Sequence, residues 1–356
     1  MRRAMPFVAL VLLTISSARA ADDEAGFTPL FNGKDLSGWV PVNVAPNTFT
    51  VGDRMIDCTG VPTGVMRTDR QYENFVLEME WMHENKKEVG NSGLFVWGDP
   101  IPAVGAPYTR GIEVQVLVNL EYRDKKSNAV TATSHGDLFS IWGATCKPDR
   151  PHPLGWARCL PSENRAKGGG EWNHYKVTAN NGVIKLEVNG KEVSGVSACN
   201  PRKGYLALES EGAECHFKNI KVKELPSTNP KPDEVAQVAE GHKLLFDGLD
   251  LDGWRGDTGS WKAGGGVLRA TGTGELATEA KFGKVEVLFD WRLAGKATGE
   301  PTVAVGGTAV KLAPKAGAKN GAWAREVIRV EDAGGPVTIK PVAGLELMSV
   351  FVRELK

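Results

Sequence analysis

The sequence predicts an all-β protein made of two tandem β-sandwiches. One observation is an internal repeat, because LFNGKDLSGW at residues 30–39 returns as LFDGLDLDGW at residues 245–254. The other is a series of short stretches that alternate apolar and polar residues between glycines and prolines, as strands with one buried face do. No stretch beyond the first twenty residues keeps a helical period for three turns. Many short strands of this kind favour antiparallel sheets packed as sandwiches.

The two copies resemble each other beyond the opening motif. FVLEMEW at residues 75–81 matches VEVLFDW at residues 285–291, and IKVKEL at the end of the first copy matches VFVREL at the end of the second. We therefore expect a first domain over residues 27–225 and a shorter one over residues 242–356. Residues 226–241, rich in Pro, Ser, Thr and Asn near their start, are expected to form an exposed linker.

The first twenty residues read as a secretory signal peptide. Arg2 and Arg3 precede an apolar run, and Ala18-Arg19-Ala20 ends it with small residues. The run is too short to span a bilayer, so we expect a periplasmic or extracellular protein without a transmembrane anchor. Loss of this leader would remove three arginines and no acidic residue, leaving a slightly acidic chain. Such a charge gives no reason to expect nucleic acid as a partner. The oligomeric state stays open.

The five cysteines all lie in the first two thirds of the chain, and none has a CxxC spacing. A structural role is therefore favoured over metal or redox chemistry. Cys146 and Cys159 bracket a proline-rich loop and are one possible disulfide in an oxidising compartment. The odd number leaves at least one thiol free.

The first copy is the expected functional one. It is longer than the second mainly because of an insertion between Asn85 and Trp172, and inserted loops on a sandwich are where binding and catalysis usually reside. The second copy has no histidine after His242 and is expected to be a scaffold or a binding module.

The stretch GIEVQVLV at residues 111–118 predicts a strand that carries chemistry. Glu113 and Gln115 alternate with Ile112, Val114 and Val116, so the two polar side chains share one face. A glycosidase needs two carboxyl groups across the scissile bond. Since Gln115 is an amide, ordinary hydrolysis by this strand alone is disfavoured, and an exposed polar strand face is the structural alternative.

A set of motifs in residues 27–225 resembles the 3-keto-disaccharide hydrolase domain family, also described as 3-keto-glucoside lyase and hydratase. The motifs are LFNGKDLSGW, the strand ending EW at residues 80–81, NSGLF at 91–95, GIEVQV at 111–116, EWNHYKV at 171–177 and VNGKEV at 188–193. The resemblance implies a concanavalin-like jelly-roll sandwich whose concave sheet holds sugar. The chain departs from many members in having Leu117-Val118-Asn119 where they carry an aspartate, which puts any role of that acid in doubt here.

The resemblance also implies a reaction on an exported carbohydrate substrate. A ketone at carbon 3 acidifies the proton at carbon 2, so the group at carbon 1 can leave by elimination, and water then adds to the enone. One base and one polarising group suffice for this route. We expect Glu113 and His135 to carry it, with Asp137 orienting the imidazole, because a histidine transfers protons well at neutral pH.

Other polar and aromatic side chains of the first copy are expected to bind the sugar, and each has a structural alternative. Arg158 and Glu163 are as readily explained as a surface ion pair, Asn91 as a turn residue, and His174 and the tryptophans as packing. The expected substrate-binding residues are Asn91, Gln115, Trp142, Arg158, Glu163, Trp172 and His174.

Rival interpretations remain at this stage. No cofactor is expected, although His135, Asp137 and Glu113 could converge on a divalent ion. A non-catalytic lectin-like module would bind glycan on the same sheet. A cell-envelope interaction protein would use both sandwiches only as surfaces. Convergence of Glu113, Gln115, Asn91 and His135 on one cleft would favour the enzyme.

Overall fold

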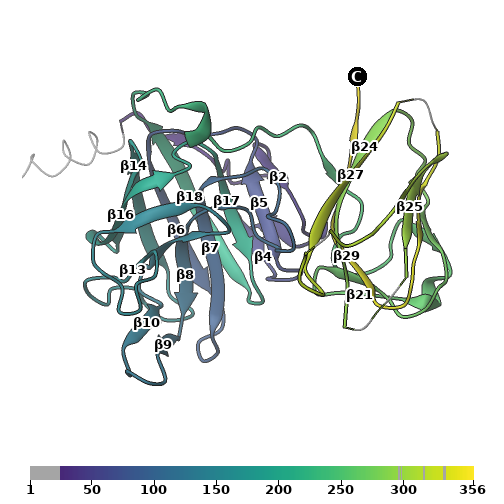
Figure 1. Cartoon of the computed structure of the whole chain (residues 1–356). Helices are drawn as coiled ribbons and strands as arrows, with labels where there is room; N and C mark the ends of the chain where they lie inside the picture. The colour runs from purple at the N-terminus through teal and green to yellow at the C-terminus, as the bar shows by residue number, and fades with distance from the viewer. Residues whose placement is uncertain (1–24, 296, 298, 316, 332–333) are drawn as a thin grey trace, which may run out of the picture.

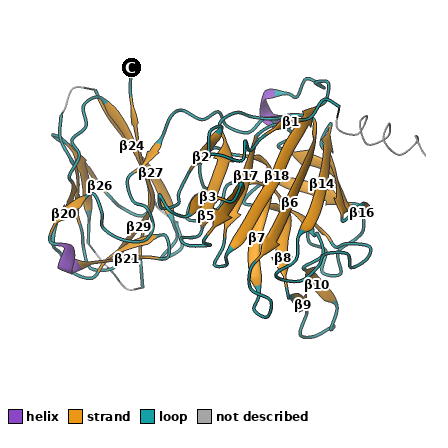
Figure 2. Ribbon diagram, turned by 180° about the vertical axis from the view of Figure 1, so that it is seen from behind, coloured by secondary structure: helices purple, strands orange, loops and turns teal. Residues whose placement is uncertain are grey.

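The computed structural model describes residues 25–295, 297, 299–315, 317–331 and 334–356, so the expected signal peptide lies outside the described residues. The described chain forms two β-sandwiches side by side, joined by a long connection (Figure 1). Its helices are two single turns of 3-10 helix, η1 (Pro232–Glu234) and η2 (Thr258–Ser260) (Figure 2). In this part of the chain no helix is long and apolar enough to cross a membrane. The all-β prediction is confirmed.

The first sandwich consists of a nine-stranded and a seven-stranded antiparallel sheet. The nine-stranded sheet has the order β12 (Thr145–Pro148), β16 (Lys191–Asn200), β15 (Val183–Val188), β14 (Asn173–Asn180), β6 (Phe75–His83), β18 (Cys215–Glu224), β4 (Met55–Cys58) and β3 (Phe49–Gly52), with β1 (Thr28–Pro29) paired to β18. The seven-stranded sheet has the order β13 (Arg158–Cys159), β11 (Leu138–Ile141), β8 (Gly111–Val118), β7 (Gly90–Gly98), β17 (Tyr205–Ser210), β5 (Gly64–Thr68) and β2 (Trp39–Pro41). A separate hairpin pairs β9 (Glu121–Arg123) with β10 (Val130–Thr133).

The second sandwich is smaller and follows the same plan. One sheet has the order β21 (Trp261–Gly264), β22 (Val267–Ala270), β29 (Leu345–Glu354), β24 (Val285–Leu293) and β27 (Ala324–Val330), with β19 (Lys243–Leu244) paired to β29. The other has the order β20 (Trp254–Gly256), β23 (Leu276–Thr278), β28 (Val337–Lys340), β25 (Thr302–Val305) and β26 (Thr308–Lys311).

The repeated opening motif makes the same contact in each sandwich. The indole Nε1 of Trp39 donates to the carbonyl of Leu30 at 2.8 Å, and that of Trp254 donates to the carbonyl of Leu245 at 2.9 Å. Each tryptophan thereby closes the loop that begins its copy and satisfies a buried donor. The repeat in the sequence is thus a repeated structural unit at the start of each sandwich.

The core of the first sandwich lies between its two sheets. Leu77, Met79 and Trp81 of β6 point into it from one sheet, and Val114 and Val116 of β8 point into it from the other. Residues between these in sequence therefore lie on the outer faces of the sheets, as period-two alternation requires. The outer face of the seven-stranded sheet carries the candidate site.

Cys146 and Cys159, one possible disulfide from the sequence, are not joined. All five cysteines are free thiols, and four of them are buried. Cys146 instead lies against the carbonyl of Ala157, and Cys159 accepts from Arg150. The residues therefore pack as small apolar side chains, in keeping with the structural role favoured from their spacing.

Candidate active site

Three neighbouring strands, β8, β7 and β17, form the centre of the candidate site. Their register places Gly93 opposite Gln115, and Leu94 opposite both Val114 and Leu208. Because Leu94, Val114 and Leu208 fill the core, the alternating residues project from the outer face. That face therefore presents Glu113 and Gln115 together, as the alternation in sequence predicted.

Two carboxyl groups converge above Gly93. A Cβ atom at this position would lie 2.9 Å from Oε2 of Glu209 and 3.0 Å from Oε1 of Glu113. Both side chains are almost wholly buried, at 1% and 6% exposed. Glycine at this point leaves the space in which the two acids from neighbouring strands approach each other.

Burial keeps protons on this pair of acids. Loss of solvent, followed by repulsion from Glu211, raises the pKa of Glu113 to about 8, although Arg158 acts in the opposite direction. Burial and then repulsion from Glu113 raise the pKa of Glu209 well above its usual range. Oε2 of Glu209 also has no hydrogen-bond partner among the described residues. The pair is therefore a proton donor near neutral pH.

A third acid, Glu211, accepts hydrogen bonds from two sides. The hydroxyl of Tyr108 donates to its Oε1 at 2.7 Å, and the side-chain amide of Asn91 donates to its Oε2 at 2.5 Å. These two bonds fix the orientation of the Glu211 carboxyl group between Tyr108 and Asn91. The cluster thus combines a buried pair of protonated acids with a third carboxyl group held by two donors.

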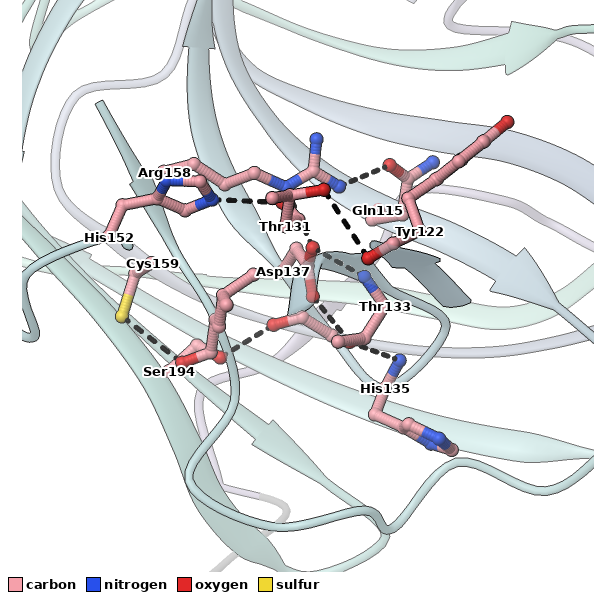
Figure 3. A network of polar contacts seen from close by, with 12 residues as sticks. Gln115, Tyr122, Thr131, Thr133, His135, Asp137, His152, Arg158, Cys159 and Ser194 are labelled. Atoms are coloured by element: carbon pink, nitrogen blue, oxygen red, sulfur yellow. Dashed lines mark hydrogen bonds and ion pairs between the residues drawn. The ribbon is translucent and has the colours of Figure 1, made fainter. Parts of the chain in front are cut away.

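A chain of hydrogen bonds leads from this cluster to a buried ion pair, and Figure 3 shows its part at Gln115, Arg158 and Asp137. The amide of Gln115 donates to Oδ1 of Asn91 at 2.8 Å, and Nη2 of Arg158 donates to Oε1 of Gln115 at 3.1 Å. Nε of Arg158 in turn donates to Oδ2 of Asp137 at 2.7 Å. These bonds fix the orientation of both amides and of the guanidinium.

Asp137 holds one end of this chain of hydrogen bonds in place. Its side chain is fully buried, and it accepts from the backbone N–H of Thr133 at 2.9 Å and from the Thr133 hydroxyl at 2.6 Å. With Arg158 these donors compensate the charge that Asp137 would otherwise bury unpaired. Asp137 therefore positions Arg158, whose guanidinium also lies over the ring of Phe139 at 4.0 Å.

A cavity of about 550 Å³ opens beside the chain, within the size range of small-molecule sites. Asn91, Gln115 and Arg158 line one part of it. The remaining lining comes from β7, β8, the β9–β10 hairpin and the insertion, namely Val89, Leu117, Leu120, Tyr122–Lys126, Thr131, Ala132, Leu154 and Trp156.

The structure brings together five of the residues singled out in the sequence, Glu113, Asn91, Gln115, Arg158 and Asp137. It does not bring His135 to them. Figure 3 places His135 on the far side of Thr133 and Asp137 from Arg158 and Gln115, and the histidine does not line the cavity. Burial lowers the pKa of His135, and its Nδ1 has no partner in the described chain.

The other expected sugar-binding residues lie elsewhere. Glu163 pairs with Arg165 and Lys191 rather than with Arg158. Trp142 is half-exposed and stacks on Tyr108, outside the cavity lining. Two further residues belong to the nine-stranded sheet, where Lys218 covers the ring of Trp172 and His174 lies 3.7 Å from Glu78.

Sequence reasoning missed Glu209, Glu211, Tyr108 and Trp156. Glu209 had a signal, since it occupies the polar position of the alternating stretch YLALES at residues 205–210. Nothing in the sequence paired that strand with residues 90–98, however, so its position beside Glu113 was not predictable. Trp156 stacks on His152.

His135, Asp137 and Glu113 do not form a metal-binding group. Among the described residues, one set of three ligand atoms lies within 4.8 Å of one another, from Glu240, His242 and Glu286 in another part of the molecule. Glu286 already pairs there with the guanidinium groups of Arg329 and Arg353. These pairs account for its charge without an ion.

Comparisons with known proteins show which family the sequence matches. The model of the 3-keto-alpha-glucoside-1,2-lyase-like domain matches residues 26–223 and 241–317. A 3-keto-disaccharide hydrolase of Bacteroides thetaiotaomicron is 22% identical over 251 residues, covering 57% of this chain and 80% of that protein.

Solved structures with the same kind of fold are also similar. A candidate glycosyl hydrolase from Parabacteroides distasonis matches with a TM-score of 0.42 and 23% identity, over 60% of this chain and 99% of that one. A carbohydrate-binding module from Bacillus subtilis matches with a TM-score of 0.38 and 12% identity, over 52% of this chain and 96% of that one. Since the family model spans more than half of the sequence, the chain belongs to the 3-keto-alpha-glucoside-1,2-lyase-like domain family.

Proposed function

We propose that the first sandwich is a carbohydrate-active enzyme that cleaves 3-keto-glycosides by elimination and then adds water. Family membership supports carbohydrate as the substrate class. The observation that carries the proposal is the hydrogen-bonded chain from Glu211 through Asn91 and Gln115 to Arg158, beside one cavity.

Arg158 is the proposed partner of the ketone. Its Nε and Nη2 are held by Asp137 and Gln115, while its Nη1 has no hydrogen bond in the described part of the chain. A cation placed on the carbon 3 oxygen stabilises the negative charge that develops there when carbon 2 loses its proton. Asp137 acts through Arg158 and is a positioning residue.

The carboxyl cluster is the proposed source of proton transfer. Glu211 takes the proton from carbon 2, and the carbon 1–oxygen bond breaks as the double bond between carbons 1 and 2 forms. A protonated acid, Glu113, gives its proton to the departing oxygen. Addition of water to carbon 1 returns a proton to carbon 2, so the two steps together amount to hydrolysis.

Incubation with both anomers of methyl 3-keto-glucoside tests the proposal. Enone absorbance and released 3-keto-glucose are followed for the wild type, Glu211→Gln, Arg158→Lys and His135→Ala. We expect the first two variants to lose about 10²-fold or more in kcat/KM, in line with loss of a proton-transfer group or of oriented charge. Glu214→Gln, an exposed acid nearby in sequence, is the matched control.

The outcomes separate the alternatives. A loss in His135→Ala as large as that in Glu211→Gln would place the base at the histidine favoured by the sequence, and not in the carboxyl cluster. Binding of the sugar without enone or free 3-keto-glucose from either anomer would overturn the enzyme and favour the lectin-like module.

A further inference from the structure

Exposed apolar side chains gather around the cavity beside Arg158. Val89, Tyr122, Leu154 and Trp156 are each between 41% and 56% exposed, and all four line it. Val89 precedes β7, Tyr122 belongs to β9, and Leu154 and Trp156 lie between β12 and β13, so separate segments place apolar groups at one point. A gathering of this kind on a soluble domain marks a contact surface for a ligand.

The indole of Trp156 is held in place at this surface. The imidazole of His152 stacks on it with the ring centroids 4.7 Å apart and an angle of 11° between the planes. His152 is itself fixed, because its Nδ1 accepts from the backbone N–H of Leu154 at 3.1 Å and its Nε2 therefore donates to the carbonyl of Thr131 at 2.9 Å. A rigid aromatic wall costs little ordering when a ligand binds to it.

The wall formed by Leu117, Leu120, Leu154 and Trp156 offers few partners to a polar ligand. One hydroxyl of the cavity lining, that of Thr131, already donates to the backbone carbonyl of Tyr122 at 3.3 Å. A sugar ring placed along the wall would leave hydroxyl groups without hydrogen bonds, at a cost of about 1–3 kcal/mol for each buried group.

Two of the four charged residues that the β9–β10 hairpin brings to the rim, Arg123 and Asp124, have partners within the hairpin. Arg123 pairs with Glu121 and donates to the carbonyl of Asn128. Asp124 accepts from the hydroxyl and backbone N–H of Ser127. The hairpin therefore closes the cavity without directing these charges at a ligand.

We propose that the leaving group of the substrate is apolar, an aromatic or aliphatic alcohol, which lies along Leu117, Leu154 and Trp156 while the 3-keto sugar binds at Gln115 and Arg158. The inference rests on the proposed function, because it assigns the two ends of one cavity to the two parts of a glycoside. The apolar wall then selects the aglycone, and the polar end selects the sugar.

Three 3-keto-glucosides that differ only in the aglycone test the inference: phenyl, glucosyl and methyl. We expect kcat/KM for the phenyl glycoside to exceed that for the glucosyl one by about 10-fold or more. Trp156→Ala should lower the value for the phenyl glycoside by about 10-fold, as loss of one aromatic contact and its buried area does. It should change the value for the methyl glycoside, whose aglycone is too small to cover the wall, by less than about 3-fold.

Further variants guard against misfolding. Trp156→Phe should keep most of the preference for phenyl, and Leu154→Gln should reduce it. Leu249→Gln, an exposed leucine of the second sandwich, should leave the preference unchanged. Equal losses of Trp156→Ala on the phenyl and methyl glycosides, or a preference for the glucosyl one, would overturn the inference while leaving the reaction intact.

A binding measurement separates the two proposals. Phenyl glucoside with an ordinary hydroxyl at carbon 3 cannot undergo the elimination. Calorimetry with it therefore measures binding without turnover, and the difference between the wild type and Trp156→Ala gives the contribution of the apolar wall. If no 3-keto-glycoside is cleaved, the proposed function fails, but binding of phenyl glucoside that weakens in Trp156→Ala still supports the apolar wall. No binding of phenyl glucoside by the wild type would overturn it.

Discussion

At the scale of single residues, the acidity of Glu113 differs strongly from that of a glutamate in water. Its carboxyl group is buried on the outer face of β8, close to other acids. The result is a carboxylic acid that keeps its proton near neutral pH. This property is open to measurement without any substrate.

Glu113→Gln is predicted to flatten the dependence of stability on pH. In the folded protein the pKa of Glu113 is about 8, whereas in the unfolded chain it is near 4.5. Between these values only the folded state holds the proton, so the wild type loses stability as pH rises, by up to about 1.4 kcal/mol per pH unit from this group. Urea unfolding at pH 5, 6, 7 and 8 should show a smaller loss for Glu113→Gln.

The matched control is Glu163→Gln in the insertion. Hydrogen bonds from Lys191 and then Arg165 lower the pKa of Glu163, so its contribution is lost as pH falls and not as it rises. This variant should keep the wild-type decrease between pH 5 and 8. Identical pH dependences for Glu113→Gln and the wild type would show that the buried carboxyl group is ionised in the folded protein.

Single residues differed in how far the sequence predicted them. Glu113 and Gln115 were placed on one face because period-two alternation fixes the direction of each side chain within a strand. His135 belongs to the irregular chain between β10 and β11, where no period fixes direction, and it points away from Arg158. An ion pair of Arg158 with Glu163 was the structural alternative to sugar binding because both lie in the insertion, but the fold pairs Arg158 with Asp137.

At the scale of elements, β7 decides how closely the acids of β8 and β17 approach. Gly93 lies between them in the sheet, and a methyl group there would contact the carboxyl groups of both Glu113 and Glu209 at about 3 Å. Burial prevents these two side chains from turning to solvent. β7 therefore affects the site because Gly93, which has no side chain, leaves room for both carboxyl groups.

Gly93→Ala is predicted to lower kcat/KM on methyl 3-keto-glucoside by about 10-fold or more while the protein stays folded. The added methyl group displaces at least one carboxyl group, and small displacements of reacting groups are costly in rate. Circular dichroism checks the fold. Gly283→Ala, where a Cβ atom meets no neighbour within 4 Å, should match the wild type in both measurements. Unchanged activity in Gly93→Ala would remove the paired acids from the reaction.

The elements themselves were predictable where alternation is regular. GIEVQVLV and FVLEMEW became β8 and most of β6, and the stretch GYLALES became β17. The insertion was not predictable in this way, since it holds short strands such as β11, β12 and β13 that carry too few residues to show a period. The pairing of β7 with β17 joins segments more than a hundred residues apart, and a single sequence does not reveal it.

At the scale of the whole molecule, the second sandwich contacts the first at several places, and two of them bear on the candidate site. Leu288 and Phe351 of the second sandwich share a buried cluster with Val65, Phe95 and Ala207 on the outer face of the seven-stranded sheet. The loop between β7 and β8 also contacts the second sandwich. There the carboxyl group of Asp290 accepts from the backbone N–H of Gly105 at 3.0 Å.

This loop connects the shorter sandwich to the carboxyl cluster. Its ends are joined by the ion pair of Arg110 with Asp99, its middle is held by Asp290, and its residue Tyr108 donates to Glu211. Arg325 binds both Asp290 and the carbonyl of Pro102. The second sandwich thus supports a donor of the candidate site without supplying a side chain to it.

Asp290→Asn is predicted to weaken both stability and turnover. Asp290 is fully buried and pairs with Arg325 at 2.7 Å, so removal of its charge leaves the guanidinium without its partner, at a cost of up to about 3–5 kcal/mol. The asparagine has one oxygen, which can accept from either Gly105 or Arg325. Its NH₂ group then lies against the N–H group of the other partner, where no hydrogen bond can form. Thermal unfolding measures the effect on stability, and kcat/KM on methyl 3-keto-glucoside measures the effect on turnover.

The control is Glu331→Gln, which breaks only the exposed pair with Lys284 and should leave both quantities near the wild type. A loss of stability with full activity in Asp290→Asn would mean that the Asp99–Arg110 pair holds Tyr108 on its own, and that the second sandwich has no part in the reaction.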